Sequence, residues 1–248
     1  MGAHMNLLAA PADRRARSAQ KVGAVLRFLR QEIWSSQDIL GGVMGVESRT
    51  AAHKNLARME DEGLLRRHKV EGLGGGAITL WGITSHGQAL AFDPATEAPA
   101  AVEQLLRTPR VGARHRAGLQ RLRMQGERAG WRDWTNGDRL PELLKGGKRP
   151  DAMATSPAGL KTAIEIERTI KTPKRYEQIL ASYLMALKSE QVHQVVWLSP
   201  TDDLALRLRA IVLGIRSVTI QKQRFAVDPQ KHHGRLSFLG YRQWPVPG

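Results

Sequence analysis

The stretch from Arg149 to Tyr176, RPDAMATSPAGLKTAIEIERTIKTPKRY, decides the fold of the second half of the chain. Its segments RPDAMAT and LKTAIEIERT are predicted to be strands, and the turn SPAG between them folds the first strand back beside the second. A long helix is expected next, with Thr172 as its cap and Pro173 in its first turn. The stretch therefore predicts a pair of adjacent strands followed by a helix.

Alternation along TAIEIERTIK divides its side chains between two faces of the strand. Glu165, Glu167 and Lys171 fall on one face, and the isoleucines point to the other, which we expect to be the core. Asp151 comes 14 residues before Glu165, and the turn brings it beside the glutamates. Three gathered carboxylates repel one another unless a cation lies between them. Because Mg²⁺ takes one or two carboxylates, water and substrate phosphate, the pattern favours a Mg²⁺ or Mn²⁺ site.

The charge of the whole chain indicates a polyanionic partner. The 248 residues include 38 Lys and Arg against 23 Asp and Glu, for a net charge of +15 and a pI near 10.8. Such an excess is typical of proteins that bind nucleic acid. The chain has no cysteine, which excludes disulfides and thiolate metal sites. It shows no signal peptide and no apolar stretch long enough for a membrane span, so a cytoplasmic protein without a membrane partner is expected.

Composition and periodicity predict two domains. Residues 1–19 are expected to be a tag remnant and a flexible basic arm, 20–93 the first domain, 94–109 a linker and 110–248 the second domain. The second domain is predicted to be α/β with a mixed central sheet, opened by a basic amphipathic helix at 114–128 that turns its leucines inward and its arginines outward.

The first domain is predicted to contain three helices, a hairpin and a short final helix. The first helix begins near Gln20, and the second is capped by Ser35 or Ser36 and ended by a turn at Gly41-Gly42. The third runs from Ser48 to Glu62. The runs LLRRHKV and ITLWGIT around the loop EGLGGGA predict the hairpin, and SHGQALAF predicts the final helix.

The endings LARMEDEGLLRR and WGITSHGQALA resemble the winged helix-turn-helix family over about residues 20–92. That resemblance implies that the third helix enters the DNA major groove while the hairpin contacts phosphates. The polar residues expected to bind DNA lie on the third helix, on the hairpin and on the basic helix: Ser48, Arg49, Thr50, His53, Lys54, Arg58, Arg66, Arg67, Lys69, Arg114 and Arg116. The alternative is a winged helix that binds protein through the same solvated faces.

Pro150-Asp151 followed by Glu165-x-Glu167 resembles the PD-(D/E)xK nuclease superfamily, which has a restriction-endonuclease-like fold. The resemblance implies Asp151 and Glu165 as metal ligands with Glu167 beside them. The superfamily places a lysine two residues after the acidic ligand, where this chain has Glu167. Lys171, which has the right strand parity, or Lys174 would then supply the missing cation.

The order of the two domains, together with EIERTIKTPKRYEQIL, is similar to the MobC-type plasmid relaxases and the replication-relaxation proteins. The resemblance implies a metal-dependent nickase that acts on double- and single-stranded DNA at a plasmid transfer origin, with relaxosome accessory and coupling proteins as partners. One alternative is a DNA-binding regulator or accessory protein whose nuclease fold is inactive. Another is an endonuclease that cuts both strands. Tyr176 could form a covalent intermediate, although packing on the sheet is the simpler interpretation.

Overall fold

The computed structural model describes residues 11–71, 77–95, 113–140, 143–144 and 147–245. The chain divides into two compact units, Met1–Gln120 and Arg121–Gly248, and the division falls inside one helix. It is a mixed α/β protein, as predicted. Among the residues that the structure describes, none of the helices combines the length and the hydropathy needed to cross a membrane.

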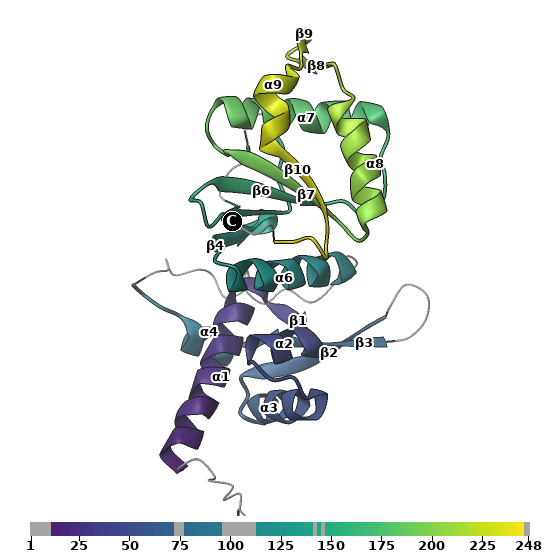
Figure 1. Cartoon of the computed structure of the whole chain (residues 1–248). Helices are drawn as coiled ribbons and strands as arrows, with labels where there is room; N and C mark the ends of the chain where they lie inside the picture. Colours follow the sequence, from purple (N-terminus) through teal and green to yellow (C-terminus); the bar gives the residue numbers. More distant parts are fainter. Residues whose placement is uncertain (1–10, 72–76, 96–112, 141–142, 145–146, 246–248) are drawn as a thin grey trace, which may run out of the picture. The chain divides into compact units, whose positions relative to one another are not determined.

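The first unit combines helices with a small antiparallel sheet of order β1-β3-β2 (Figure 1). Its elements are α1 (Pro11–Glu32), β1 (Trp34–Ser36), α2 (Gln37–Val43), α3 (Arg49–Asp61), β2 (Leu65–Glu71), β3 (Ala77–Ile83) and α4 (Ser85–Ala91). The third helix, the hairpin and the final helix are confirmed. Strand β1 was not expected, because three residues are too few to show an alternating pattern.

Two predictions about the first unit are wrong. Helix α1 begins at Pro11, so residues 11–19 are helical and not a flexible arm. Proline suits a first helical turn, and the alanines and arginines that follow it favour helix. Gly41 and Gly42 lie inside α2, and the chain turns instead at Gly45, whose φ is +65°. A Cβ on Gly41 would lie 3.2 Å from the Val46 oxygen, so the glycine permits a close approach.

Several predicted features fall on residues that the structure does not describe. They are residues 1–10 of the arm, the hairpin loop at 72–76 and the linker from residue 96 onward.

The second unit is built on a five-stranded mixed sheet of order β10-β7-β6-β5-β4. The elements assigned to it, and the helix that spans the division, are α6 (Ala113–Arg128), β4 (Arg132–Asn136), β5 (Ala152–Thr155), β6 (Lys161–Ile166), α7 (Pro173–Lys188), β7 (Gln194–Ser199), α8 (Asp202–Leu213), β8 (Ser217–Ile220), β9 (Gln223–Ala226), α9 (Pro229–His232) and β10 (Leu236–Gly240). Strands β10, β7 and β6 are parallel, whereas β5 and β4 are antiparallel additions.

The structure confirms the predicted strand pair and the helix after it. Strands β5 and β6 pair with Ala152 opposite Ile164, and Thr172 caps α7 by accepting from the Arg175 amide. Strand β8 does not join the central sheet but pairs with β9 in a separate hairpin. Strand β10, which was not predicted, forms the edge of the sheet beside β7 (Figure 1).

Both faces of β6 are buried, which corrects the expectation of an outward glutamate face. Ala163, on the face that Glu165 shares, packs in the main hydrophobic cluster with Tyr176 and Tyr183 of α7. Ile164, on the opposite face, is fully buried as well. Pairing with a parallel neighbour explains the difference, since central parallel strands are covered on both sides. The two glutamates therefore lie in the protein interior, with exposed fractions of 7% for Glu165 and 5% for Glu167.

Helix α6 follows the prediction for its leucines but not for all its arginines. Leu119 and Leu122 are buried, as expected. Arg123 is buried too, and it pairs with Glu127 one turn along the helix at 2.7 Å. A long aliphatic stem lets an arginine cover apolar surface while its head finds a partner.

Gly137→Ala is expected to lower the free energy of unfolding by about 1–3 kcal/mol. The Gly137 amide donates to the main-chain carbonyl oxygen of Asp151 at 2.8 Å. A Cβ on residue 137 would lie 1.9 Å from the main-chain oxygen of Pro150. The two segments must therefore separate next to Asp151. Urea unfolding checks the value, with Gly234→Ala as the matched control because a Cβ on Gly234 meets nothing within 4 Å. Equal stability of the two variants would contradict the prediction.

Candidate functional site

The first candidate site lies at the junction of β5 and β6. Asp151 immediately precedes β5, and its Oδ2 accepts a hydrogen bond from the Ile166 amide at 2.7 Å. This bond fixes the Asp151 carboxylate against the end of β6, close to Glu165. The sequence prediction that the turn brings Asp151 beside the glutamate-bearing strand is confirmed.

Glu165 is buried and contacts both an amine and a phenol. The Lys148 Nζ lies 2.8 Å from its Oε1, and the Tyr183 hydroxyl donates to the same oxygen. Burial, together with the nearby charge of Asp151, raises the pKa of Glu165 to about 7, against the opposing effects of Lys148 and Tyr183. Near neutral pH this carboxyl therefore exists in both protonation states.

Glu167 has a separate set of partners. Its Oε2 accepts from the Lys171 ammonium and, at 3.1 Å, from the Tyr176 hydroxyl. The Tyr176 hydroxyl also accepts from the Lys171 amide at 3.0 Å, so the tyrosine joins the strand end to α7. Burial, together with the neighbouring Glu167, raises the pKa of Tyr176 to about 12 against the opposing hydrogen bond from the Lys171 amide. Tyr176 thus packs against the sheet as a neutral phenol.

The structure brings together only part of the predicted catalytic set. Asp151 and Glu165 lie close together, whereas Glu167 is engaged with Lys171 and Tyr176. Lys174 is exposed in the first turn of α7. Among the described residues, no group of three or more His, Cys, Asp or Glu side chains gathers in a way that could hold a metal ion. The pair Asp151 and Glu165 still matches the one or two carboxylates that Mg²⁺ takes from protein.

Lys148 and Tyr183 were not predicted. Lys148 belongs to the basic run KGGKRP just before Asp151, and only the fold shows that its amine turns toward β6. Tyr183 follows Tyr176 by two helical turns, so the two lie on one face of α7. This seven-residue spacing is the signal in the sequence that could have predicted a second tyrosine facing β6.

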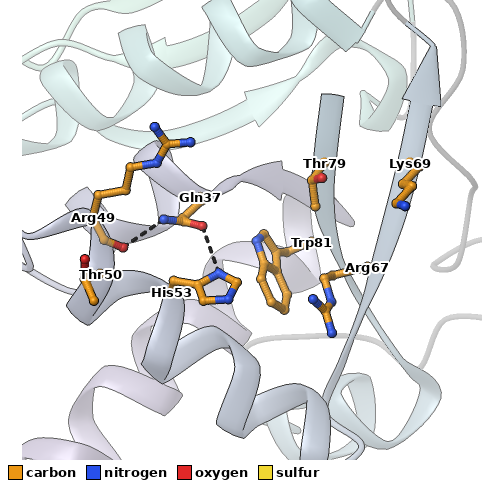
Figure 2. Close-up of a pocket in the computed structure, with 8 residues that line it drawn as sticks. All are labelled: Gln37, Arg49, Thr50, His53, Arg67, Lys69, Thr79 and Trp81. Atoms are coloured by element: carbon orange, nitrogen blue, oxygen red, sulfur yellow. Dashed lines mark hydrogen bonds between the residues drawn. The ribbon is translucent and has the colours of Figure 1, made fainter. Parts of the chain in front are cut away.

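The second candidate site lies in the first unit, between α3 and the hairpin. Strand register pairs Arg67 with Trp81 and Lys69 with Thr79, which places all four side chains on one face of the sheet. With residues of α2 and α3 they line a pocket of about 830 Å³ (Figure 2). Its lining residues are Gln37, Arg49, Thr50, His53, Arg67, Lys69, Thr79 and Trp81.

Gln37 organises one wall of this pocket. Its Nε2 donates to the Arg49 oxygen at 2.8 Å, and its Oε1 lies 3.2 Å from the His53 Nδ1. His53 meets the Trp81 ring edge-on at 5.9 Å between centroids. Figure 2 shows these contacts joining the start of α2 to α3 above the tryptophan. Gln37 was not among the predicted residues, because a single glutamine after a serine carries no distinctive pattern.

On the opposite wall, the Arg67 guanidinium lies 5.5 Å from the Trp81 ring centroid and 2.7 Å from a Glu60 oxygen. The hydrogen bond with Glu60 raises the pKa of Arg67, so the guanidinium is charged throughout the working range. Trp81 is 1% exposed, and its indole Nε1 has no hydrogen-bond partner. The pocket thus combines cations with a buried, unpaired donor.

The remaining predicted DNA-binding residues lie away from this pocket. Arg66 is on the other face of the hairpin, where its Nε contacts His68 at 3.2 Å. Arg58 donates to the Ser18 hydroxyl at 2.8 Å. Ser48 caps α3, and Lys54 is exposed on that helix. The Arg114 side chain lies outside the described residues.

Arg116 is also engaged within the protein. Its Nε lies 3.0 Å from the Oε2 of Glu32, a carboxylate with no exposed surface. Gln120 donates to the same oxygen at 3.2 Å. Arg116 therefore neutralises a buried charge, and the expectation that it faces DNA from the outer side of the helix is not met.

In the comparisons with known proteins, no family model matches the chain, and no significant match is found among curated proteins or solved structures.

Proposed function

We propose that the chain is a DNA-binding, metal-dependent nickase of the plasmid relaxase type, acting at a transfer origin. In this proposal the first unit is a winged helix that binds DNA, and the second is a PD-(D/E)xK-type nuclease. The observation that carries the proposal is the convergence of Asp151, Glu165 and Lys148 at the end of β6. A net charge of +15 supports a polyanionic substrate.

Asp151 and Glu165 are the residues that would hold Mg²⁺ or Mn²⁺. When bound, such an ion polarises a phosphodiester and lowers the pKa of a coordinated water. The Asp151 carboxylate is already oriented by the Ile166 amide, which donates to its Oδ2. Tyr183 restrains Glu165 from the side of α7.

Lys148 is the residue that we assign to the role of the missing lysine. Its ammonium lies against Glu165, whereas Lys171 is committed to Glu167. A cation at this place would stabilise the negative charge that develops on the phosphate in the transition state. Lys171 then neutralises Glu167, which also accepts from Tyr176 of α7 and so connects the end of β6 to that helix.

A second candidate function is a DNA-binding regulator or relaxosome accessory protein with an inactive nuclease fold. The observation that favours it is the partnering of both glutamates by a lysine and a tyrosine. Carboxylates neutralised in this way have less need of a metal ion. An endonuclease that cuts both strands is the third possibility to be separated by experiment.

The test is a cleavage assay on a binding site obtained by selection from a randomised duplex pool. Supercoiled plasmid carrying that site is incubated with the protein and either Mg²⁺ or Mn²⁺. Open-circular product is the expected result, and linear product would identify the double-strand endonuclease. If the plasmid stays supercoiled while Asp151→Ala and wild type bind the site equally, the nickase proposal fails and the regulator remains.

A further inference from the structure

The pocket between α3 and the β2–β3 hairpin is rich in donors that have no partner inside the protein. Among the described residues, no carboxylate pairs with Arg49 or with Lys69. Arg67 lies on the same face and is the one pocket cation with an acidic neighbour, Glu60. Cations gathered on a concave surface without matching acids concentrate positive potential there.

Trp81 provides an independent sign of a ligand. Its side chain is 99% buried, yet its indole N–H makes no hydrogen bond. Figure 2 shows the nitrogen on the edge of the ring that faces Gln37, within the pocket lining. A buried donor without a partner costs about 1–3 kcal/mol, so such groups normally have an acceptor. The acceptor would be supplied from outside the chain.

The chemistry of the lining selects the ligand class. Arginine, lysine and the indole are donors only, and the Gln37 oxygen is already engaged by His53. A guanine edge also presents acceptors alone, but it is flat and is matched by the fork of a single arginine. The donors of this pocket come from α3 and from both strands of the hairpin, an arrangement that suits the several oxygens of a tetrahedral phosphate. A phosphate group needs donors alone, and arginine and lysine are its usual partners.

We propose that this pocket binds one phosphate group, held by Arg49, Lys69 and the Trp81 indole N–H. Thr50 and Thr79 offer hydroxyls beside them, and Arg67 adds charge from the opposite wall. The phosphate is either one phosphodiester of bound DNA, in which case the inference rests on the proposed function, or the phosphate of a free nucleotide. In the DNA case the pocket fixes the register of α3, and the exposed face around Lys54 is left to contact bases.

The Trp81 indole N–H signal in a ¹H–¹⁵N spectrum of the full chain tests the site directly. Trp81→Phe identifies the signal among the six tryptophans, and the other five serve as internal controls. The probes are sodium phosphate, thymidine 5′-monophosphate and a selected DNA duplex, each against sodium chloride of equal ionic strength. A saturable downfield shift of the Trp81 signal alone is expected.

Variants separate a specific pocket from general basic charge. Arg49→Gln and Lys69→Gln are each expected to weaken binding of the probe about tenfold. With the duplex as probe, each variant should reduce the slope of the logarithm of the binding constant against the logarithm of salt concentration by about one, which corresponds to one counterion fewer released. Arg27→Gln is the matched control, because it removes the same charge from an exposed position on α1 of the same unit, outside the pocket and outside the expected DNA-binding residues. Its effect should stay within about twofold.

The outcomes distinguish the site from the proposed function. A shift with the duplex that requires Lys69 places a backbone phosphate in the pocket. A shift with phosphate or nucleotide that DNA does not compete away identifies a free nucleotide, and the site proposal stands even if the chain binds no DNA. If the duplex binds while no probe moves the Trp81 signal, the site proposal falls and the DNA-binding proposal stands.

Discussion

Asp151→Asn is expected, under the nickase function proposed above, to lower metal-dependent nicking of supercoiled plasmid by about 10²- to 10³-fold while leaving DNA affinity unchanged. Asparagine keeps an oxygen that can accept the Ile166 amide, so the local fold is retained. It removes the negative charge that a divalent cation requires beside Glu165. The measurement is the initial rate of open-circular product at saturating Mg²⁺, together with DNA binding by fluorescence anisotropy.

Asp203→Asn is the matched control, since it changes an exposed carboxylate of the same unit on α8. That variant should nick DNA like wild type. If Asp151→Asn nicks DNA at the wild-type rate, the proposal that Asp151 is a metal ligand is wrong. A parallel loss of DNA affinity in that variant would show that Asp151 acts through folding rather than through chemistry.

The buried carboxyl of Glu165 is expected to make the stability of the metal-free protein fall between pH 4.5 and pH 8. Its pKa is about 7 in the folded chain against an ordinary 4.5, so the folded state holds the proton more tightly than the unfolded state does. The contribution of Glu165 to stability is therefore greatest below pH 4.5, decreases as the pH rises through 7 and is absent above that. The difference amounts to about 3 kcal/mol.

Glu165→Gln isolates this effect, because glutamine stays neutral and its oxygen can still accept from Tyr183. The free energy of unfolding in urea, measured for both proteins across the pH range, gives the difference. Wild type should lose about 3 kcal/mol relative to the variant as the pH rises. Glu177→Gln, at an exposed position on α7, should follow wild type. A constant difference between wild type and Glu165→Gln would refute the assignment.

Periodicity and turn chemistry predicted most of the local structure. The alternation of AIEIE and the turn SPAG gave the β5–β6 pair, and Thr172-Pro173 gave the start of α7, because these signals lie within a few neighbouring residues. The approach of Asp151 to Glu165 followed from the same pairing. The burial of Glu165 did not follow, since it depends on Tyr183 in a helix that the strand pattern cannot place.

The features that sequence could not reveal involve contacts between distant residues. Strand β10 pairs with β7 across some forty residues, and its short run LSFLG resembles many loop segments. The Lys148 amine reaches Glu165 only once β5 has folded back. The pocket of the first unit depends on α2, α3 and two strands together, so Trp81 and Gln37 had no shared signal along the chain.

The placement of β10 has a consequence for how the chain folds during synthesis. The three strands of the first unit's sheet lie within residues 34–83, so all of them emerge from the ribosome well before the second unit has been translated. The second unit cannot place a neighbour on the outer side of β7 until residues 236–240 have emerged. Until then β7 is an uncovered edge, open to pairing with another chain. We therefore expect the first unit to fold early, and nascent chains that stop before residue 236 to aggregate through the second.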